Sequence, residues 1–155
     1  MLKKTLLPGL LFLVFAAFRL DAATVSFLVI ETGLPRDSGS SRHSAMWENG
    51  LMDVFFETGH IVSNAPILRV YRKLNEGFPG EAERDFKEAQ ESEVDFFVVV
   101  VVSHPEPHNV SMRLFRTNSQ QMLFEHKYTE KAYKTQKEEY DTVKSSIGVL
   151  AARVR

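Results

Sequence analysis

The segment Phe96-Phe97-Val98-Val99-Val100-Val101-Val102 decides the fold, because it is an unbroken run of apolar residues with high β propensity. Seven residues are too few to cross a bilayer, which takes about 20. A continuous rather than alternating apolar run is typical of a strand covered on both faces. Burying each such side chain contributes roughly 1.5–3 kcal/mol, against a backbone ordering cost of about 1–2 kcal/mol per residue. We therefore expect a central strand at 95–103 with other elements packed on both sides.

The residues before this strand predict strands that alternate with helices. The expected elements are a strand, a helix, a short strand, a short helix that could also be extended, and a charged helix, at 24–31, 44–58, 60–63, 64–73 and 81–92. Ser44 is the expected N-cap of the first helix, and Gly59 the residue that ends it. Gly50 inside that helix indicates close packing against the sheet.

The residues after the central strand predict a hairpin and a helix. Two alternating runs with a short polar link indicate an antiparallel hairpin at 109–129, with Phe124 and Leu123 on opposite faces. The final helix, from about Thr135 to the end, has an apolar seam spaced by three and four residues. The seam could dock on the sheet or on a partner helix.

The predicted fold class is α/β, with α+β character in the C-terminal half. We expect a two-layer or three-layer mixed sheet of about five strands, closed by the hairpin and the amphipathic C-terminal helix. The core is expected to contain Trp47, Leu51, Phe55, Phe96, Val98, Val100, Ile147 and Leu150.

The N-terminus has the three-part layout of a secretory signal peptide. Lys3 and Lys4 precede an apolar run from Leu6 to Phe18, and small residues follow at Ala22 and Ala23. We expect a signal peptide at 1–23 and a single domain at 24–155, exported and soluble in the periplasm without an integral membrane segment. The alternative is an uncleaved anchor, although Arg19 interrupts the apolar run well short of a full span.

Charge and cysteine content exclude several classes. Removing residues 1–23 leaves 16 basic and 19 acidic residues, a net charge of −3. A slightly acidic chain without a basic stripe lacks the footprint of nucleic-acid binding. The absence of cysteine excludes disulfides and a lipid anchor on cysteine. The core must therefore stabilise an exported domain by itself.

Three segments resemble a known group of exported bacterial domains. WENGLMDVFFETGHIVSNAPI at 47–67 resembles their helix-Gly-strand junction, ESEVDFFVV at 91–99 the start of their central strand, and 110–128 their closing hairpin. The group comprises the TolB amino-terminal domain, the penicillin-binding-protein activator lipoproteins and the periplasmic domain of the curli secretion channel. The resemblance implies non-enzymatic work in the periplasm, as a docking domain for envelope machinery. This chain departs from the group in having Glu91-Ser92-Glu93-Val94 before Asp95 and no lipidated cysteine.

The loop at 33–43 is a candidate ligand site. It lies between the end of a strand and the start of a helix, where α/β folds bind anions, and its candidate residues are Arg36, Arg42, His43 and Ser44. The glycines fit neither a P-loop nor a dinucleotide fingerprint, so a solvated loop is the alternative.

A second candidate is a metal site at His104, Glu106 and His108, whose imidazole and carboxylate donors suit zinc. The alternative is a polar turn held extended by two prolines, and no cofactor is expected. No nucleophile motif is present, and Glu138 and Glu139 are expected on an exposed helix face.

The sequence thus favours a non-enzymatic interaction module that binds envelope proteins through the hairpin and the last helix. The alternative function is a small-ligand or anion-binding domain that uses the loop at 33–43.

Overall fold

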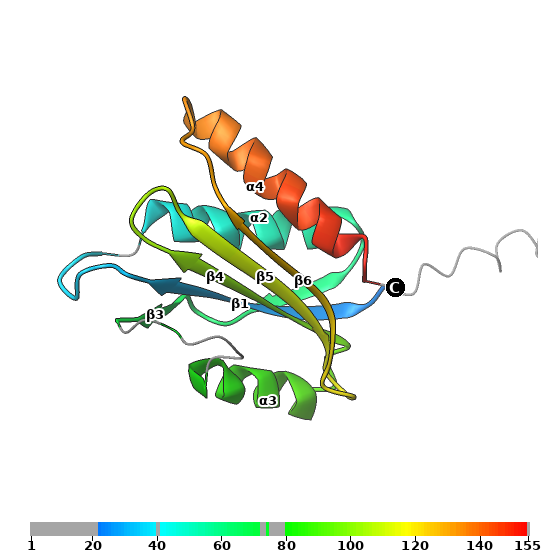
Figure 1. Cartoon of the computed structure of the whole chain (residues 1–155). Helices are drawn as coiled ribbons and strands as arrows, with labels where there is room; N and C mark the ends of the chain where they lie inside the picture. The colour runs from blue at the N-terminus through cyan, green and yellow to red at the C-terminus, as the bar shows by residue number, and fades with distance from the viewer. Residues whose placement is uncertain (1–21, 40, 72–73, 75–79, 155) are drawn as a thin grey trace, which may run out of the picture.

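The strand predicted to be central is the middle of the observed sheet. The computed structural model describes residues 22–39, 41–71, 74 and 80–154. β4 (Phe96–Ser103) lies between β1 (Thr24–Thr32) and β5 (Asn109–Arg116) in a sheet of order β2-β1-β4-β5-β6, where β2 is Ile61–Asn64 and β6 is Gln121–Thr129 (Figure 1). A sixth strand, β3 (Leu68–Val70), also pairs with β1. β2, β3 and β4 each pair with β1 in parallel. β5 pairs antiparallel with β4, and β6 pairs antiparallel with β5, so the sheet is mixed.

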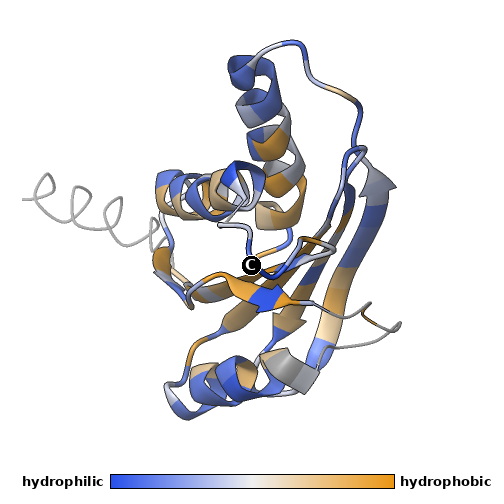
Figure 2. Cartoon of the chain, turned by 90° about the vertical axis from the view of Figure 1, so that its left-hand side faces the viewer, coloured by the Kyte–Doolittle hydropathy of each residue, from blue (hydrophilic) through white to orange (hydrophobic). Residues whose placement is uncertain are grey.

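Helices cover both faces of the sheet and make three layers. α2 (Arg42–Glu57) and α4 (Gln136–Ala151) lie on one face, whereas α3 (Glu83–Glu91) and the 3-10 turn η1 (Gly80–Ala82) lie on the other (Figures 1 and 2). The predicted α/β class with a mixed sheet and a C-terminal helix is confirmed. No helix within the described ranges is both long and apolar enough to cross a membrane.

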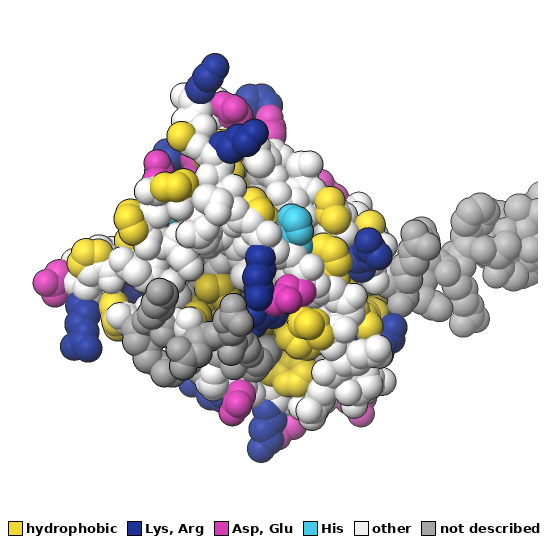
Figure 3. Space-filling view, in the orientation of Figure 1, with side chains coloured by type: hydrophobic (Ala, Val, Ile, Leu, Met, Phe, Trp, Pro, Cys, Tyr) yellow, Lys and Arg dark blue, Asp and Glu magenta, His cyan; other side chains and the backbone are white. Residues whose placement is uncertain are grey.

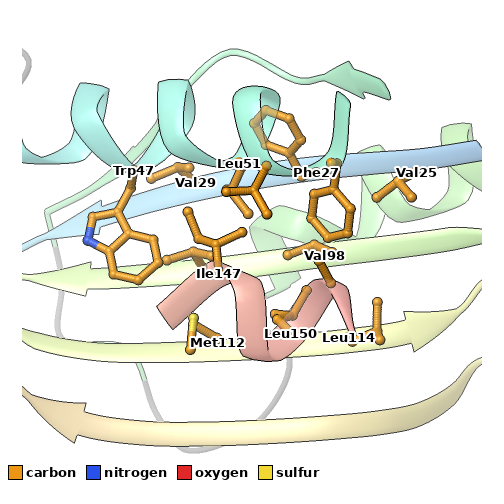
Figure 4. Close-up of a cluster of buried hydrophobic side chains, with 14 of the residues drawn as sticks. Val25, Phe27, Val29, Trp47, Leu51, Val98, Met112, Leu114, Ile147 and Leu150 are labelled. Atoms are coloured by element: carbon orange, nitrogen blue, oxygen red, sulfur yellow. The ribbon is translucent and has the colours of Figure 1, made fainter. Parts of the chain in front are cut away.

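Two apolar clusters form the core, one on each face of β4. Phe96, Val98, Val100 and Val102 point into the larger cluster under α2 and α4. Figure 4 shows part of this cluster, in which Trp47 and Leu51 of α2 and Ile147 and Leu150 of α4 converge on strand side chains. Phe97 and Val99 point into the smaller cluster under α3. All eight residues expected in the core are buried: Trp47, Leu51, Phe55, Phe96, Val98, Val100, Ile147 and Leu150.

The segment 64–73, for which a short helix and extended chain were both open, contains strand β3 and no helix in its described residues 64–71. Residues 72–73 lie outside the described residues. Pro66 disfavours helical geometry at the residue before it. The chain therefore stays extended, and Leu68 and Val70 pair with Ile30 and Thr32 of β1. This additional strand raises the sheet from the expected five strands to six.

Two details of α2 and α4 differ from the sequence prediction. The N-cap of α2 is Ser41 rather than Ser44, since the Ser41 side chain accepts hydrogen bonds from the backbone N–H groups of His43 and Ser44. Gly50 packs closely as expected, but against α4 rather than the sheet. A Cβ at Gly50 would lie 2.9 Å from Ile147 Cδ1. The seam of α4 is thus docked within the chain, on α2 and the sheet.

A β-bulge changes the faces of the hairpin. The β5–β6 register shifts between Leu114 and Phe115, which pair with Phe124 and Met122 and leave Leu123 as the extra residue. A bulge breaks the two-residue alternation of a strand. Leu123 therefore packs against the same cluster as Phe124, and the predicted opposite placement is wrong.

Gly33 is required where β1 ends beside the β4–β5 turn. Its φ is +82°, and a Cβ there would lie 2.3 Å from the His104 carbonyl oxygen. The left-handed conformation costs a non-glycine residue about 1–2 kcal/mol, and overpacking typically costs about 1–3 kcal/mol more.

We expect Gly33→Ala to lower the free energy of unfolding by roughly 2–5 kcal/mol. Gly39→Ala is the matched control in the same loop, because a Cβ at Gly39 meets nothing within 4 Å. Urea denaturation followed by circular dichroism measures both changes. Equal stability of the two variants would contradict the close approach of Gly33 and His104.

Candidate functional site

Histidine and glutamate side chains gather where β1 and β4 end. His43 comes from the first turn of α2, and His104 and His108 come from the turn between β4 and β5. Glu130 follows β6 directly, and Glu139 lies in the first turn of α4. His43, His108, Glu130 and Glu139 are each less than a tenth exposed. We call these five residues the histidine cluster.

Backbone contacts bring the segments of the histidine cluster together. The His104 N–H donates to the Thr32 carbonyl at 2.9 Å, which joins the β4–β5 turn to the end of β1. The Glu130 N–H donates to the His108 carbonyl at 2.8 Å and holds the residue after β6 against the same turn. The cluster is therefore built by long-range strand pairing.

Another buried glutamate, Glu31, fixes the start of α2. Its Oε2 accepts a hydrogen bond from the Ser41 N–H at 3.2 Å, and its Oε1 pairs with Arg69 Nε. Because Ser41 caps α2, these contacts set the position of His43 two residues later.

His43 lies between two carboxylates. Its Nδ1 is 2.6 Å from Glu139 Oε1, and its Nε2 is 2.7 Å from Glu130 Oε2. Trp47 Nε1 also donates to His43 Nε2 at 3.2 Å. A neutral imidazole has a single N–H, and here a carboxylate oxygen faces each of its two nitrogens. A second positive group is therefore favoured at this point, either a proton that makes the ring an imidazolium or another cation.

The other two histidines pack around this group. The His43 and His108 rings stack with their centroids 4.2 Å apart, and the His104 ring meets His108 edge-on at 4.6 Å. His108 Nδ1 and both carboxylate oxygens of Glu130 are buried without a hydrogen bond of acceptable geometry. Looser contacts compensate them in part: Glu130 faces His43 Nε2 at 2.7 Å and the Tyr133 hydroxyl, and His108 interacts with the Ser103 backbone.

Burial and charge separate the pKa values of the three histidines. Burial lowers the pKa of His43, but hydrogen bonds to Glu130 and Glu139 outweigh this effect, so the pKa is raised above 6.5. Burial lowers the pKa of His104, and the neighbouring His108 lowers it further. Burial and the charge of His43 lower the pKa of His108. The pKa of His43 is therefore shifted in the opposite direction to those of His104 and His108.

The four ligand residues predicted for the loop do not form one site in the structure. His43 and Ser44 are buried, and Ser44 Oγ lies 3.4 Å from His104 Nε2. Arg42 Nη2 is 3.1 Å from Glu139 Oε2, whereas the Arg36 guanidinium lies over the Tyr71 ring at 5.6 Å. Because the Ser41 side chain already engages the first amides of α2, anion binding at this loop stays a prediction without a further observation in its favour.

The three residues predicted to bind metal do not all lie together. His104 and His108 belong to the histidine cluster, but the Glu106 side chain is 75% exposed and lies 3.6 Å from His108 Nε2. Among the described residues, the group whose ligand atoms converge is His43, His108 and Glu130.

The sequence does not predict the two glutamates of the histidine cluster, Glu130 and Glu139. Glu130 follows a strand in a polar connection and carries no local signal. The prediction that Glu138 and Glu139 share an exposed face is wrong for Glu139, which is buried. Its position on the face that also carries Val143 was the available signal, because these residues are four apart.

Comparisons with known proteins identify the fold. No family model and no curated protein matches the chain. Similar solved structures include the PelC dodecamer from Paraburkholderia phytofirmans, at 10% identity and a TM-score of 0.50 over 86% of this chain and 90% of that one. The LpoB C-terminal domain from Salmonella enterica matches at 12% identity and a TM-score of 0.44 over 80% of this chain and 94% of that one.

TolB from Acinetobacter baumannii also matches, at 10% identity and a TM-score of 0.46 over 86% of this chain and 27% of that one. TolB, which the sequence resembles, is thus among the similar structures. At these identities the likeness concerns the fold alone.

The raised pKa of His43 predicts a pH-dependent contribution of Glu139 to stability. A histidine with a raised folded pKa stabilises the protein fully below its unfolded value of about 6.5, and this contribution is lost as pH rises through the folded value. We expect Glu139→Gln to lower the free energy of unfolding by about 1.5–3 kcal/mol at about pH 6 and by less at about pH 9.

Urea denaturation in buffer free of divalent metal, at both pH values, measures this difference. Asp141→Asn is the control on the same helix, because Asp141 pairs only with the exposed Lys137 among the described ion pairs. A loss in Glu139→Gln that is independent of pH would contradict the charge interaction with His43.

Proposed function

We propose that this protein is an exported, non-enzymatic interaction module of the cell envelope that binds a protein partner through the side of its sheet that ends at β6. The free edge of β6, which carries the exposed residues Met122, Glu125, His126 and Lys127, is called the hairpin edge. The observation that carries the proposal is that the order of the described sheet ends at β6, so this nine-residue strand has one side without a strand partner.

A free edge of this length suits protein recognition. The outward N–H and C=O groups of an edge strand are a template for adding a strand from another chain. Glu125, Lys127 and the bulge at Leu123 are features that limit uncontrolled edge-to-edge aggregation. The hairpin edge is thus accessible but protected, as expected of a specific binding surface.

The surface next to the hairpin edge is partly apolar. Met122 is 48% exposed, and Val149 of α4 is 53% exposed. A groove of about 410 Å³ lies between α3 and the hairpin, and it is lined by Glu83, Phe86, Lys87, Gln90, Phe115 and Gln120. Figure 3 shows hydrophobic side chains among charges of both signs on this view of the molecule, without a large field of one sign. Such a surface suits a protein rather than a polyanion.

The serine and histidine next to the histidine cluster do not favour catalysis. Ser44 and His104 are a serine and a histidine in proximity, but Ser44 is fully buried and 3.4 Å from the ring nitrogen. A nucleophile needs an accessible hydroxyl within hydrogen-bond reach of its base. The fold itself is compatible with assembly, since PelC, which shares it, is a dodecamer.

Export predicts a defined mature N-terminus. We expect the protein in the periplasmic fraction to begin at Ala23 or Thr24, because cleavage is predicted after Ala22 or Ala23. Intact mass of the fractionated protein measures this, and Leu13→Arg should abolish export while Leu13→Ile leaves it unchanged. A full-length mass in the membrane fraction would instead identify an uncleaved anchor.

Site-specific crosslinking in intact cells tests the contact surface. A photoreactive phenylalanine placed at Met122 or Val149 should give one discrete adduct with an envelope protein. The same group at exposed Asp37, in the loop after β1, is the control and should give none. Placed at Phe56, which is 73% exposed near the opposite edge, it tests the other apolar surface.

An adduct from Phe56 alone would reject the hairpin edge as the contact surface. Absence of a discrete adduct at all four positions would reject the interaction module. Adducts equally frequent at Asp37 would also count against the proposal, because they would indicate nonspecific collision.

A further inference from the structure

We propose that His43, His108 and Glu130 bind one divalent transition-metal ion of the zinc class, with Glu139 as the residue that orients His43. This inference is independent of the proposed interaction with a partner. It rests on the convergence of three ligand-type side chains from three separate segments of the chain.

The three side chains lie close enough together to be candidate ligands of one ion. One ligand atom from each lies within 4.8 Å of the others. His43 is 5% exposed, His108 is 6% exposed and Glu130 is 4% exposed, so water competes little for these positions. Each comes from an element fixed by pairing or capping: the start of α2, the β4–β5 turn and the residue after β6.

Buried polar atoms without a well-formed hydrogen bond lie at the same point, beside the ion pair of His43 and Glu130. His108 Nδ1 and both Glu130 carboxylate oxygens are buried without a hydrogen bond of acceptable geometry. A proton on His43 Nε2 would neutralise Glu130 but leave His108 Nδ1 unpaired. A metal ion would satisfy a nitrogen lone pair and the carboxylate together, which favours the ion over the proton alone.

Glu139 is placed to orient His43, as carboxylates do beside the histidine ligands of metal ions. With an ion bound, Glu139 Oε1, 2.6 Å from His43 Nδ1, would accept a hydrogen bond from the protonated Nδ1, and Nε2, which faces both Glu130 and Trp47 Nε1, would be the ligand atom. Arg42 in turn holds Glu139 at 3.1 Å. Metal-binding histidines almost always donate their other ring N–H to such a carboxylate or to a carbonyl, which fixes the tautomer and raises the basicity of the ligand.

The donor set selects the class of ion. Two imidazole nitrogens and one carboxylate oxygen suit zinc and similar divalent ions, whereas calcium and magnesium prefer oxygen ligands throughout. Three protein ligands leave one of the four usual zinc positions for water or another small ligand.

An ion here would crosslink the domain. It would join α2, the β4–β5 turn and the connection from β6 to α4, which are far apart in sequence. The chain has no cysteine, so disulfides cannot supply this constraint after export. A metal that binds the folded state but not the unfolded chain stabilises the fold by mass action.

The test is zinc binding by the full mature domain, purified with a tag that contains no histidine. After incubation with excess Zn²⁺ and desalting, elemental analysis should find about one equivalent per chain. The melting temperature should rise with Zn²⁺ but not with Mg²⁺. Less than about a tenth of an equivalent in the unaltered protein would overturn the proposal.

Matched variants locate the site. His108→Asn and Glu130→Gln should each abolish zinc retention and the thermal shift. His126→Asn and Glu88→Gln are the controls, because both residues are exposed and lie outside the converging group. Loss of zinc in either control, or retention in both His108→Asn and Glu130→Gln, would show that the ligands are elsewhere.

Cobalt substitution keeps the proposal testable if a ligand variant does not fold. Co²⁺ bound to the unaltered protein should give the strong visible absorption of a four-coordinate nitrogen and oxygen site, and Zn²⁺ should displace it. A weak spectrum like that of hydrated Co²⁺ would overturn the proposal without reference to any variant.

Discussion

The burial of β4 on both faces is the constraint from which the rest of the structure follows. Its side chains alternate between a cluster under α2 and α4 and a cluster under α3. A strand with two apolar faces needs cover on both sides and strand partners on both edges, and β1 and β5 provide the latter. The three layers and the central position of β4 are consequences of this one requirement.

The histidine cluster lies at the end of this constrained core. Because β1 and β4 are parallel and adjacent, the loops that leave them begin side by side, and His43 meets His104 and His108 there. β6 runs antiparallel to β5 and so in the same direction as β4, and Glu130, which follows β6, therefore lies at the same end of the sheet. Buried charges are costly unless they are paired. The ion pairs of His43 with Glu130 and Glu139, and the buried His108 Nδ1 without a well-formed hydrogen bond, therefore distinguish this region from an ordinary polar surface.

Much of the fold could be predicted from local patterns, whereas the site could be predicted only in part. Long apolar runs and periodic helices identified β1, β4, α2 and α4 because their burial is written into consecutive residues. The sequence leaves helix and extended chain both open at β3, because three residues carry too little periodicity, and its pairing with β1 decides its structure. The histidines were candidates from their residue type, but Glu106 was chosen over Glu130 because only proximity in sequence was visible.

The sequence by itself determined the α/β class, the central strand, the composition of the core and the absence of disulfides. These properties depend on residue type and short-range spacing, which fix local conformation and the need for burial. The tertiary structure decided which distant side chains share a site. It brought Glu130 and Glu139 to His43, moved Glu106 into solvent, and placed Gly50 against α4. Such contacts depend on strand order and helix packing, which no local pattern specifies.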